Sequence, residues 1–285
     1  MALNNSNSID KDWYLIKKIT PYLYLIQENF EKIDSHYYTS FTNMYLIIGS
    51  HTALLFDTGT GIVNLRPYIK PIIKNHELII INSHNHFDHV GGNYFFEETM
   101  IHRLDFKKLT KNMDLRFLSS SNSIVKNYLE KINYELSFAN SMVPLNGDEV
   151  FELGGLKVNV IYTPGHTPGS ICLYLDTGEI FTGDTFQLGA IFLPSTEIVN
   201  DYIASLNKIL NIATKFPNPK LYPGHEKIGL SINYIHELIN TINIIETKTP
   251  VIDNHIISKI YDFTDFKLIF LKFLLFKQNL FILSS

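Results

Sequence analysis

The sequence contains one cysteine, Cys172, and therefore cannot form a disulfide bond within the chain. Disulfides are typical of secreted proteins, so their absence indicates a reducing compartment. The first ten residues, MALNNSNSID, also lack the apolar segment of a signal peptide. Both absences predict a cytoplasmic protein.

Charge and long apolar runs are also scarce. Charged residues make up 18% of the 285-residue chain, and the formal net charge is −4. Enzymes that act on nucleic acids usually carry a basic face, so we expect no nucleic-acid partner. A membrane-spanning helix needs about 20 mostly apolar residues, and the most apolar stretch, 267–283, is interrupted. The interruptions are Lys272, Lys277, Gln278 and Asn279. We therefore expect no spanning segment.

The chain shows no internal repeat and no low-complexity linker, which predicts a single domain over residues 1–285. Its apolar carboxyl-terminal tail, 254–285, is predicted to pack as a helix or a strand. Contact with a membrane surface, or with a second chain in a homodimer, is the alternative for this tail.

Short apolar runs between turn residues predict strands, and longer periodic stretches predict helices. The predicted strands are 22–27, 43–49, 52–57, 77–82, 150–153, 156–162, 171–175, 179–182 and 220–222. The predicted helices are 62–75, 200–215 and 231–247. Strands with helices outside, repeated in two halves, predict a sandwich of two sheets covered by helices. The polar stretch 103–141 fits no sheet pattern. We interpret it as a helical excursion near the site and a candidate lid.

Three histidines and an aspartate follow the predicted strand 77–82 within six residues: His84, His86, Asp88 and His89. Alternate residues of an extended segment point the same way, so His84 and His86 can face one metal ion. Asp88 and His89 follow in a turn and can reach a second ion, and Gly91 and Gly92 allow close backbone approach there. Imidazole and carboxylate together suit zinc and iron better than calcium or magnesium. Because a chain this long can fold without a structural metal, we expect the metal to serve chemistry.

Three further candidates each lie at the end of a predicted strand beside glycine or proline. His166 lies in Thr-Pro-Gly-His-Thr-Pro-Gly, Asp184 follows Thr-Gly, and His225 follows Tyr-Pro-Gly. Loops held by a rigid sheet are where functional sites usually form. His166 can complete a three-histidine group, and Asp184 can bridge two ions.

These segments, in this order and preceded by the turn Phe56-Asp57-Thr58-Gly59, resemble the motifs of the metallo-β-lactamase superfamily over about residues 12–228. The resemblance implies a four-layer αββα sandwich that holds two zinc ions, with iron or manganese as alternatives. It implies His84, His86 and His166 on one ion and Asp88, His89 and His225 on the other, with Asp184 between them. Asp57 would then orient the loop that carries the ligands.

The implied chemistry is hydrolysis of an acyl ester or thioester. Two ions about 3.5–4 Å apart can hold a bridging hydroxide that attacks an acyl carbonyl, with Asp88 and Asp184 as the catalytic carboxylates. The sequence has no G-x-S-x-G motif that would supply a serine nucleophile. Cys172 lies in a predicted apolar strand and is expected to be a buried thiol. A thiolate, whose conjugate acid has a pKa of about 8.5, leaves without an added proton, so the site accommodates a thioester.

Within the superfamily, the sequence resembles the acyl-coenzyme A thioesterase branch. Matches outside the metal motifs carry this resemblance, among them Asp12-Trp13-Tyr14 and Asp201-Tyr202. Glyoxalase II would be expected to show a glycine-rich basic segment after Asp184, whereas 185–192 is mostly apolar and uncharged. We therefore predict a small-molecule acyl substrate, with Phe186, Leu188 and Phe192 as candidate pocket residues.

Other activities of the superfamily remain open at this point. A lactonase or a glyoxalase II-like hydrolase would use the same metal motifs. A dioxygenase that oxidises persulfides would need one iron ion held by two histidines and one carboxylate. His84, His166 and Asp184 would satisfy that requirement equally well.

Overall fold

The structure is a computed structural model, and it describes residues 13–29, 39–109, 130, 141–248, 258–262 and 266–271. Its larger sheet has seven strands in sequence order, β1 to β7. They are β1 (Tyr14–Lys18), β2 (Leu23–Asn29), β3 (Phe41–Ile48), β4 (Thr52–Phe56), β5 (Glu77–Asn82), β6 (Glu98–His102) and β7 (Ser141–Leu145). Strands β1 to β4 pair antiparallel, and β4 to β7 pair parallel.

The second sheet has five strands in the order β13-β11-β10-β9-β8. They are β8 (Val150–Glu152), β9 (Lys157–Tyr162), β10 (Ile171–Leu175), β11 (Glu179–Gly183) and β13 (Lys220–Pro223). Strands β8 to β11 form an antiparallel meander, and β13 joins β11 in parallel.

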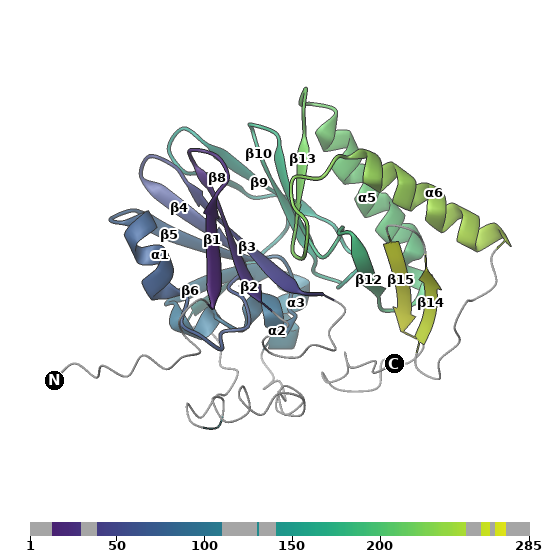
Figure 1. The fold of residues 1–285 in the computed structure, drawn as a ribbon, viewed down its shortest axis with the longest axis horizontal. Coiled ribbons are helices and arrows are strands. Elements are labelled where there is room, and N and C mark those ends of the chain that lie inside the picture. The colour runs from purple at the N-terminus through teal and green to yellow at the C-terminus, as the bar shows by residue number, and fades with distance from the viewer. Residues whose placement is uncertain are drawn as a thin grey trace.

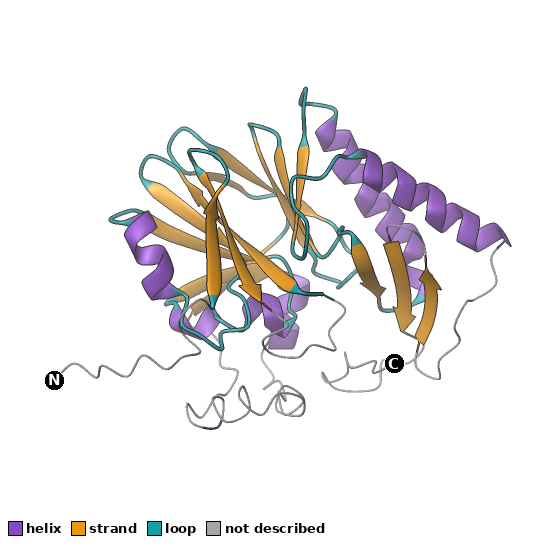
Figure 2. Ribbon diagram, in the orientation of Figure 1, coloured by secondary structure: helices purple, strands orange, loops and turns teal. Residues whose placement is uncertain are grey.

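The helices lie outside the two sheets (Figures 1 and 2). They are α1 (Arg66–Ile73), α2 (Phe87–Val90), α3 (Arg103–Leu109), α5 (Val199–Ala213) and α6 (Asn233–Lys248), with short 3-10 turns η2 (Asn93–Phe95) and η4 (Thr196–Ile198). Proline near its first turn helps α1 begin at Arg66. In α5, buried residues recur at helical spacing, from Val199 and Tyr202 to Leu206, Ile209 and Ala213.

Three apolar layers show that the fold is an αββα sandwich. One layer packs α1 against the larger sheet through residues such as Leu55 and Ile69. A second lies between the two sheets and includes Phe56, Leu173 and Phe181. A third packs α5 and α6 against the second sheet. The predicted four-layer architecture is therefore confirmed, and the burial of apolar side chains on both faces of each sheet stabilises it.

Most of the predicted elements occur, with shifted ends. The helix predicted over 62–75 is shorter, because 62–65 form a buried loop before α1. Strands β1, β6, β7 and β12 (Gly189–Leu193) were not predicted. Strand β7 begins at Ser141, so the interpretation of 103–141 as wholly non-sheet is wrong at that end. Its helical beginning is present as α3, but residues 110–129 and 131–140, and with them the candidate lid, lie outside the described residues.

A third sheet joins the carboxyl-terminal tail to the body of the protein. It has the order β12-β15-β14, with β12 (Gly189–Leu193), β14 (Ser258–Asp262) and β15 (Phe266–Leu271). Leu268 and Ile269 of β15 are fully buried, which confirms that this part of the tail packs as a strand. Residues 272–285 lie outside the described residues. Within the described chain, none of the helices has the length and apolarity needed to cross a membrane.

Candidate metal centre

The first candidate ligands leave the larger sheet at the end of β5. This strand runs parallel to both of its neighbours, and Ile80, Ile81 and Asn82 are buried in it. Beyond it, the backbone N–H of Ser83 donates to Asp57 Oδ1 at 2.7 Å, and the Ser83 hydroxyl donates to Asp57 Oδ2 at 2.8 Å. His84 follows in a bend, and His86 has extended backbone, with φ −74° and ψ 149°. Asp88 and His89 lie in the short helix α2, which starts directly after His86.

Glycines let the two loops around this helix touch. A Cβ atom on Gly91 would lie 2.1 Å from the carbonyl oxygen of Thr60, and one on Gly92 would lie 2.4 Å from that of Thr58. Neither position leaves room for a side chain. The expected close backbone approach at Gly91 and Gly92 is therefore present, and it packs α2 against the loop that follows β4.

Three histidine side chains converge in a first group. His166 Nε2 lies 2.9 Å from His86 Nδ1 and 3.2 Å from His84 Nε2, and the latter two nitrogens are 2.9 Å apart. Asp184 Oδ2 lies 3.5 Å from His166 Nε2 and 3.9 Å from His84 Nε2. The four side chains together form a cluster with the dimensions of a metal site.

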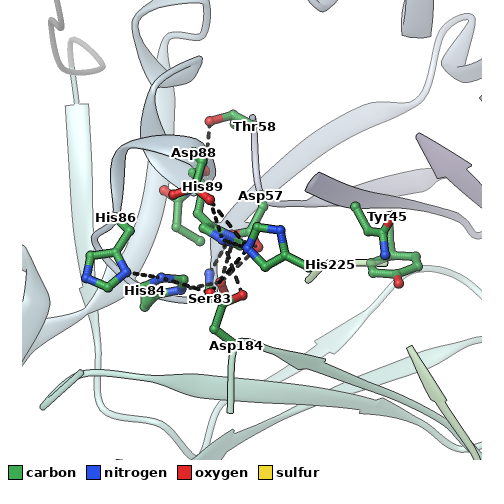
Figure 3. Close-up of polar contacts among 12 residues, drawn as sticks. Tyr45, Asp57, Thr58, Ser83, His84, His86, Asp88, His89, Asp184 and His225 are labelled. Carbon is green, nitrogen blue, oxygen red and sulfur yellow. Dashed lines mark hydrogen bonds and ion pairs between the residues drawn. The ribbon is translucent and has the colours of Figure 1, made fainter. Parts of the chain in front are cut away.

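Asp88, His89 and His225 form a second group beside the first (Figure 3). The Nε2 atoms of His89 and His225 are 3.3 Å apart and lie 3.5 Å and 3.4 Å from Asp88 Oδ2. Asp184 reaches this group as well, with Oδ1 3.3 Å from His89 Nε2 and Oδ2 3.3 Å from His225 Nε2. The structure thus brings all seven sequence-predicted candidates together, with Asp184 in contact with both groups.

Hydrogen bonds on the far side of the rings fix how four of the histidines face the centre. His89 Nδ1 lies 2.8 Å from Asp57 Oδ2, and Ser83 Oγ lies 3.0 Å from His84 Nδ1. His166 and His225 donate from Nδ1 to the backbone oxygens of Phe192 and Phe41, both at 2.9 Å. A proton held on Nδ1 leaves the Nε2 lone pair free toward the centre, as metal binding requires.

The histidine pKa values are lowered in the first group and raised in the second. Burial lowers the pKa of His84 and His166, and it lowers the pKa of His86 to about 3. These three imidazoles are therefore neutral and offer lone pairs at neutral pH. Burial also lowers the pKa of His89 and His225, but the carboxylates of Asp184 and Asp88 outweigh it and hold both values above the ordinary one.

The donor set fits a metal better than it fits a network of hydrogen bonds. Nitrogen ligands of a tetrahedral zinc ion lie about 3.3–3.4 Å apart, and the nitrogens of the three-histidine group are separated by 2.9–3.2 Å. Two neutral nitrogens with facing lone pairs repel each other unless a cation or a proton lies between them. Asp184 Oδ1 is buried and accepts no hydrogen bond from the described residues. A buried carboxylate oxygen needs a hydrogen-bond donor or a cation, and a metal ion shared with His89 Nε2, 3.3 Å away, would supply it.

The three predicted pocket residues differ in their surroundings. Phe186 is fully buried in the core between the second sheet and α5. Leu188 and Phe192 are partly buried and pack at the edges of two apolar clusters. Cys172 is fully buried in β10, and burial raises the pKa of its thiol to about 11, so it is not a nucleophile at neutral pH.

One residue that bonds the loops of the centre was not predicted from the sequence. Asp105, in α3, accepts hydrogen bonds from both loops that carry the three-histidine group. A single aspartate in a polar helical stretch gives no local signal, because what makes it notable is the packing of α3 against two distant loops.

Comparison with known proteins identifies the family. A model of the metallo-beta-lactamase superfamily matches residues 37–225. The chain belongs to the metallo-β-lactamase superfamily. It is 25% identical to an acyl-coenzyme A thioesterase of Homo sapiens over 233 residues, which cover 75% of this chain and 81% of that one. It is 32% identical to a probable metallo-hydrolase of Methanocaldococcus jannaschii over 204 residues, which cover 70% and 93%.

Solved structures of metallo-β-lactamase proteins share the fold. A metallo-β-lactamase family protein of Thermus thermophilus aligns with a TM-score of 0.59 at 20% identity, covering 79% of this chain and 81% of that one. A superfamily protein of Sulfolobus tokodaii aligns with a TM-score of 0.54 at 19% identity, covering 84% and 91%. The family match, the hydrolase relatives and the cluster of histidine and aspartate side chains together show that the chain is a metal-dependent hydrolase of this superfamily.

Proposed function

We propose that this hydrolase cleaves acyl thioesters of the acyl-coenzyme A type, with two zinc ions held by the seven side chains of the candidate centre. The observation that carries the substrate class is the similarity to acyl-coenzyme A thioesterases, which spans 81% of the human protein. It extends beyond the metal motifs, which all activities of the superfamily have in common.

In this proposal, His84, His86 and His166 hold one ion, Asp88, His89 and His225 hold the other, and Asp184 contacts both. When bound, the ions would polarise the acyl carbonyl and lower the pKa of a water molecule, so that it loses a proton and attacks as hydroxide. Asp88 is 14% exposed, against 9% for Asp184. Its carboxylate is the more accessible of the two, and in this proposal it accepts the proton of the attacking water.

The chemistry of the leaving group also favours a thioester. A thiolate departs without prior protonation, whereas an amine requires an acid. The apolar sequence that follows Asp184, which includes Leu188 and Phe192, is better suited to binding an acyl chain than to binding glutathione, a charged peptide. The backbone of this segment reaches the centre, because His166 Nδ1 donates a hydrogen bond to the Phe192 carbonyl at 2.9 Å.

A hydroxyacylglutathione hydrolase activity is the second candidate. The chain is 32% identical to the mitochondrial enzyme of Saccharomyces cerevisiae over 170 residues, but these cover 52% of that enzyme. The substrate would again be a thioester. The two candidates therefore differ in the thiol part of the substrate and share the metal chemistry.

A substrate panel tests the proposal. Purified protein loaded with zinc should hydrolyse acyl-coenzyme A thioesters at least about 10-fold faster, in kcat/KM, than lactones, β-lactams or S-lactoylglutathione. Each 10-fold preference corresponds to about 1.4 kcal/mol of additional transition-state stabilisation. Preference for a lactone would overturn the thioesterase proposal and leave the metal centre in place. One iron per chain with oxygen uptake on persulfides would overturn hydrolysis itself.

Removing the metal should abolish activity and lower stability together. Ions that bind only the folded state stabilise it by about 2.7 kcal/mol at a concentration 100-fold above Kd. Dialysis against a chelator should therefore eliminate turnover and lower Tm, and zinc should restore both. A chelated sample that keeps full activity would contradict a metal-dependent mechanism.

A further inference from the structure

A buried carboxylate outside the candidate ligand set lies beside the three-histidine group. Asp105, the third residue of α3, is 0% exposed. Its Oδ2 atom accepts hydrogen bonds from the Thr167 hydroxyl at 2.6 Å and from the Asn85 N–H at 3.1 Å. Its Oδ1 atom accepts a hydrogen bond from the Gly169 N–H at 2.9 Å.

The three donors belong to the two segments that supply the three-histidine group. Asn85 stands between His84 and His86, and Thr167 follows His166 directly. These segments are about 80 residues apart in the chain and come from different sheets: His84 follows β5, and His166 lies between β9 and β10. The carboxylate of Asp105 therefore links both segments to the same helix, α3, through hydrogen bonds.

Gly169 packs so closely against Asp105 that no side chain would fit between them. A Cβ atom on Gly169 would lie 2.6 Å from Asp105 Cγ and 2.7 Å from its backbone nitrogen. The loop that carries His166 thus rests directly on the start of α3, and the position of Asp105 sets the position of the loop.

Asp57 makes an equivalent arrangement on the other side of the centre. It accepts from Ser83 N–H and Ser83 Oγ, and it holds His89 Nδ1 at 2.8 Å. Asp57 thus orients a member of the second group. Among the described residues, Asp105 is the side chain whose carboxylate bonds both segments of the first group.

We propose that Asp105 is a positioning residue that holds His84, His86 and His166 at the spacing one metal ion requires. The proposal rests on the metal centre of the proposed function, and it is independent of the acyl substrate. Partners that orient metal ligands typically contribute 10–100-fold to metal affinity or activity. We therefore expect Asp105 to affect one of the two ions more than the other.

The test uses variants that remove the hydrogen bonds and keep the shape. In Asp105→Asn, the amide has one acceptor oxygen, and its NH₂ group faces a donor. Thr167→Val removes the hydroxyl that donates to Asp105 and that also lies 2.8 Å from Ser170 Oγ, whereas Thr167→Ser keeps it. Glu179→Gln is the matched control, since Glu179 is 9% exposed, accepts a hydrogen bond from the Tyr22 hydroxyl at 2.8 Å, and lies at the opposite end of β11 from Asp184.

The readout is metal binding to metal-free protein, without substrate. Competition between each protein and a zinc chelator gives the affinities of the first and second equivalents of zinc. The visible absorption of the cobalt-substituted proteins reports the ligand geometry of each equivalent.

Asp105→Asn should weaken one equivalent by about 10–100-fold and alter the cobalt spectrum of that equivalent alone. Thr167→Val should give a smaller loss in the same equivalent, and Thr167→Ser and Glu179→Gln should match the wild type. Wild-type affinities in both Asp105→Asn and Thr167→Val, or an equal loss in Glu179→Gln, would overturn the proposal. A wild-type protein that binds no metal would instead remove the proposed function on which it rests.

Discussion

Replacing Asp184 with asparagine should lower kcat/KM for the best thioester substrate by more than about 100-fold while the fold is kept. Partners outside a ligand set already contribute 10–100-fold, and Asp184 contacts both groups of the centre. Its oxygens lie 3.3 Å from His89 Nε2 and His225 Nε2 and 3.5 Å from His166 Nε2. Asparagine keeps the shape but offers a neutral oxygen and an NH₂ group that cannot bind a cation.

The measurement combines steady-state kinetics with metal analysis and circular dichroism of the same preparation. Asp176→Asn is the matched control, because Asp176 is an exposed aspartate in the turn between β10 and β11. This control should keep full activity. An Asp184→Asn protein that retains turnover, with both ions bound, would rule out a mechanism that needs a carboxylate between the two groups.

The centre could be predicted from sequence because its signals are local. His84, His86, Asp88 and His89 lie within six residues, and His166, Asp184 and His225 each follow a strand beside glycine or proline. Such positions reveal their chemistry without knowledge of packing. The two sheets could also be predicted, because β5 and β9 to β11 are short apolar runs bounded by turn residues.

Elements that depend on distant partners could not be predicted in the same way. Strand β7 contains Pro144 and is only partly buried, so its parallel pairing with β6 leaves no periodic pattern. Strand β12 pairs with β15, which lies more than 70 residues away in the chain. The role of Asp105 depends on three donors from two remote loops, and no window of sequence contains them. Tertiary contacts decide these features, and local propensity does not.

Replacing Phe181 with alanine should cost about 3–5 kcal/mol of the free energy of unfolding, the range for large aromatic side chains in a packed core. Phe181 is fully buried between the sheets. Its ring centroid lies 4.9 Å from that of Tyr45, 5.4 Å from that of Tyr222 and 6.4 Å from that of Phe56. Whole domains are stable by about 5–15 kcal/mol, so this loss is a large fraction of the total. The denaturant concentration at the midpoint of unfolding should therefore fall markedly.

Phe216→Ala is the matched control, since it deletes the same ring from a half-buried position, where the ring centroid lies 6.3 Å from that of Tyr174. We expect it to cost about 1 kcal/mol. The contact between Phe181 and Phe56 also joins the strands that deliver Asp184 and Asp57 to the centre, three residues and one residue further along the chain. Phe181→Ala should therefore weaken zinc binding as well, whereas Phe216→Ala should leave it unchanged. Equal losses of stability in the two variants would contradict the packing of the two sheets through this cluster. In a close-packed interior, deleting a buried ring should destabilise the fold more than deleting a half-buried one.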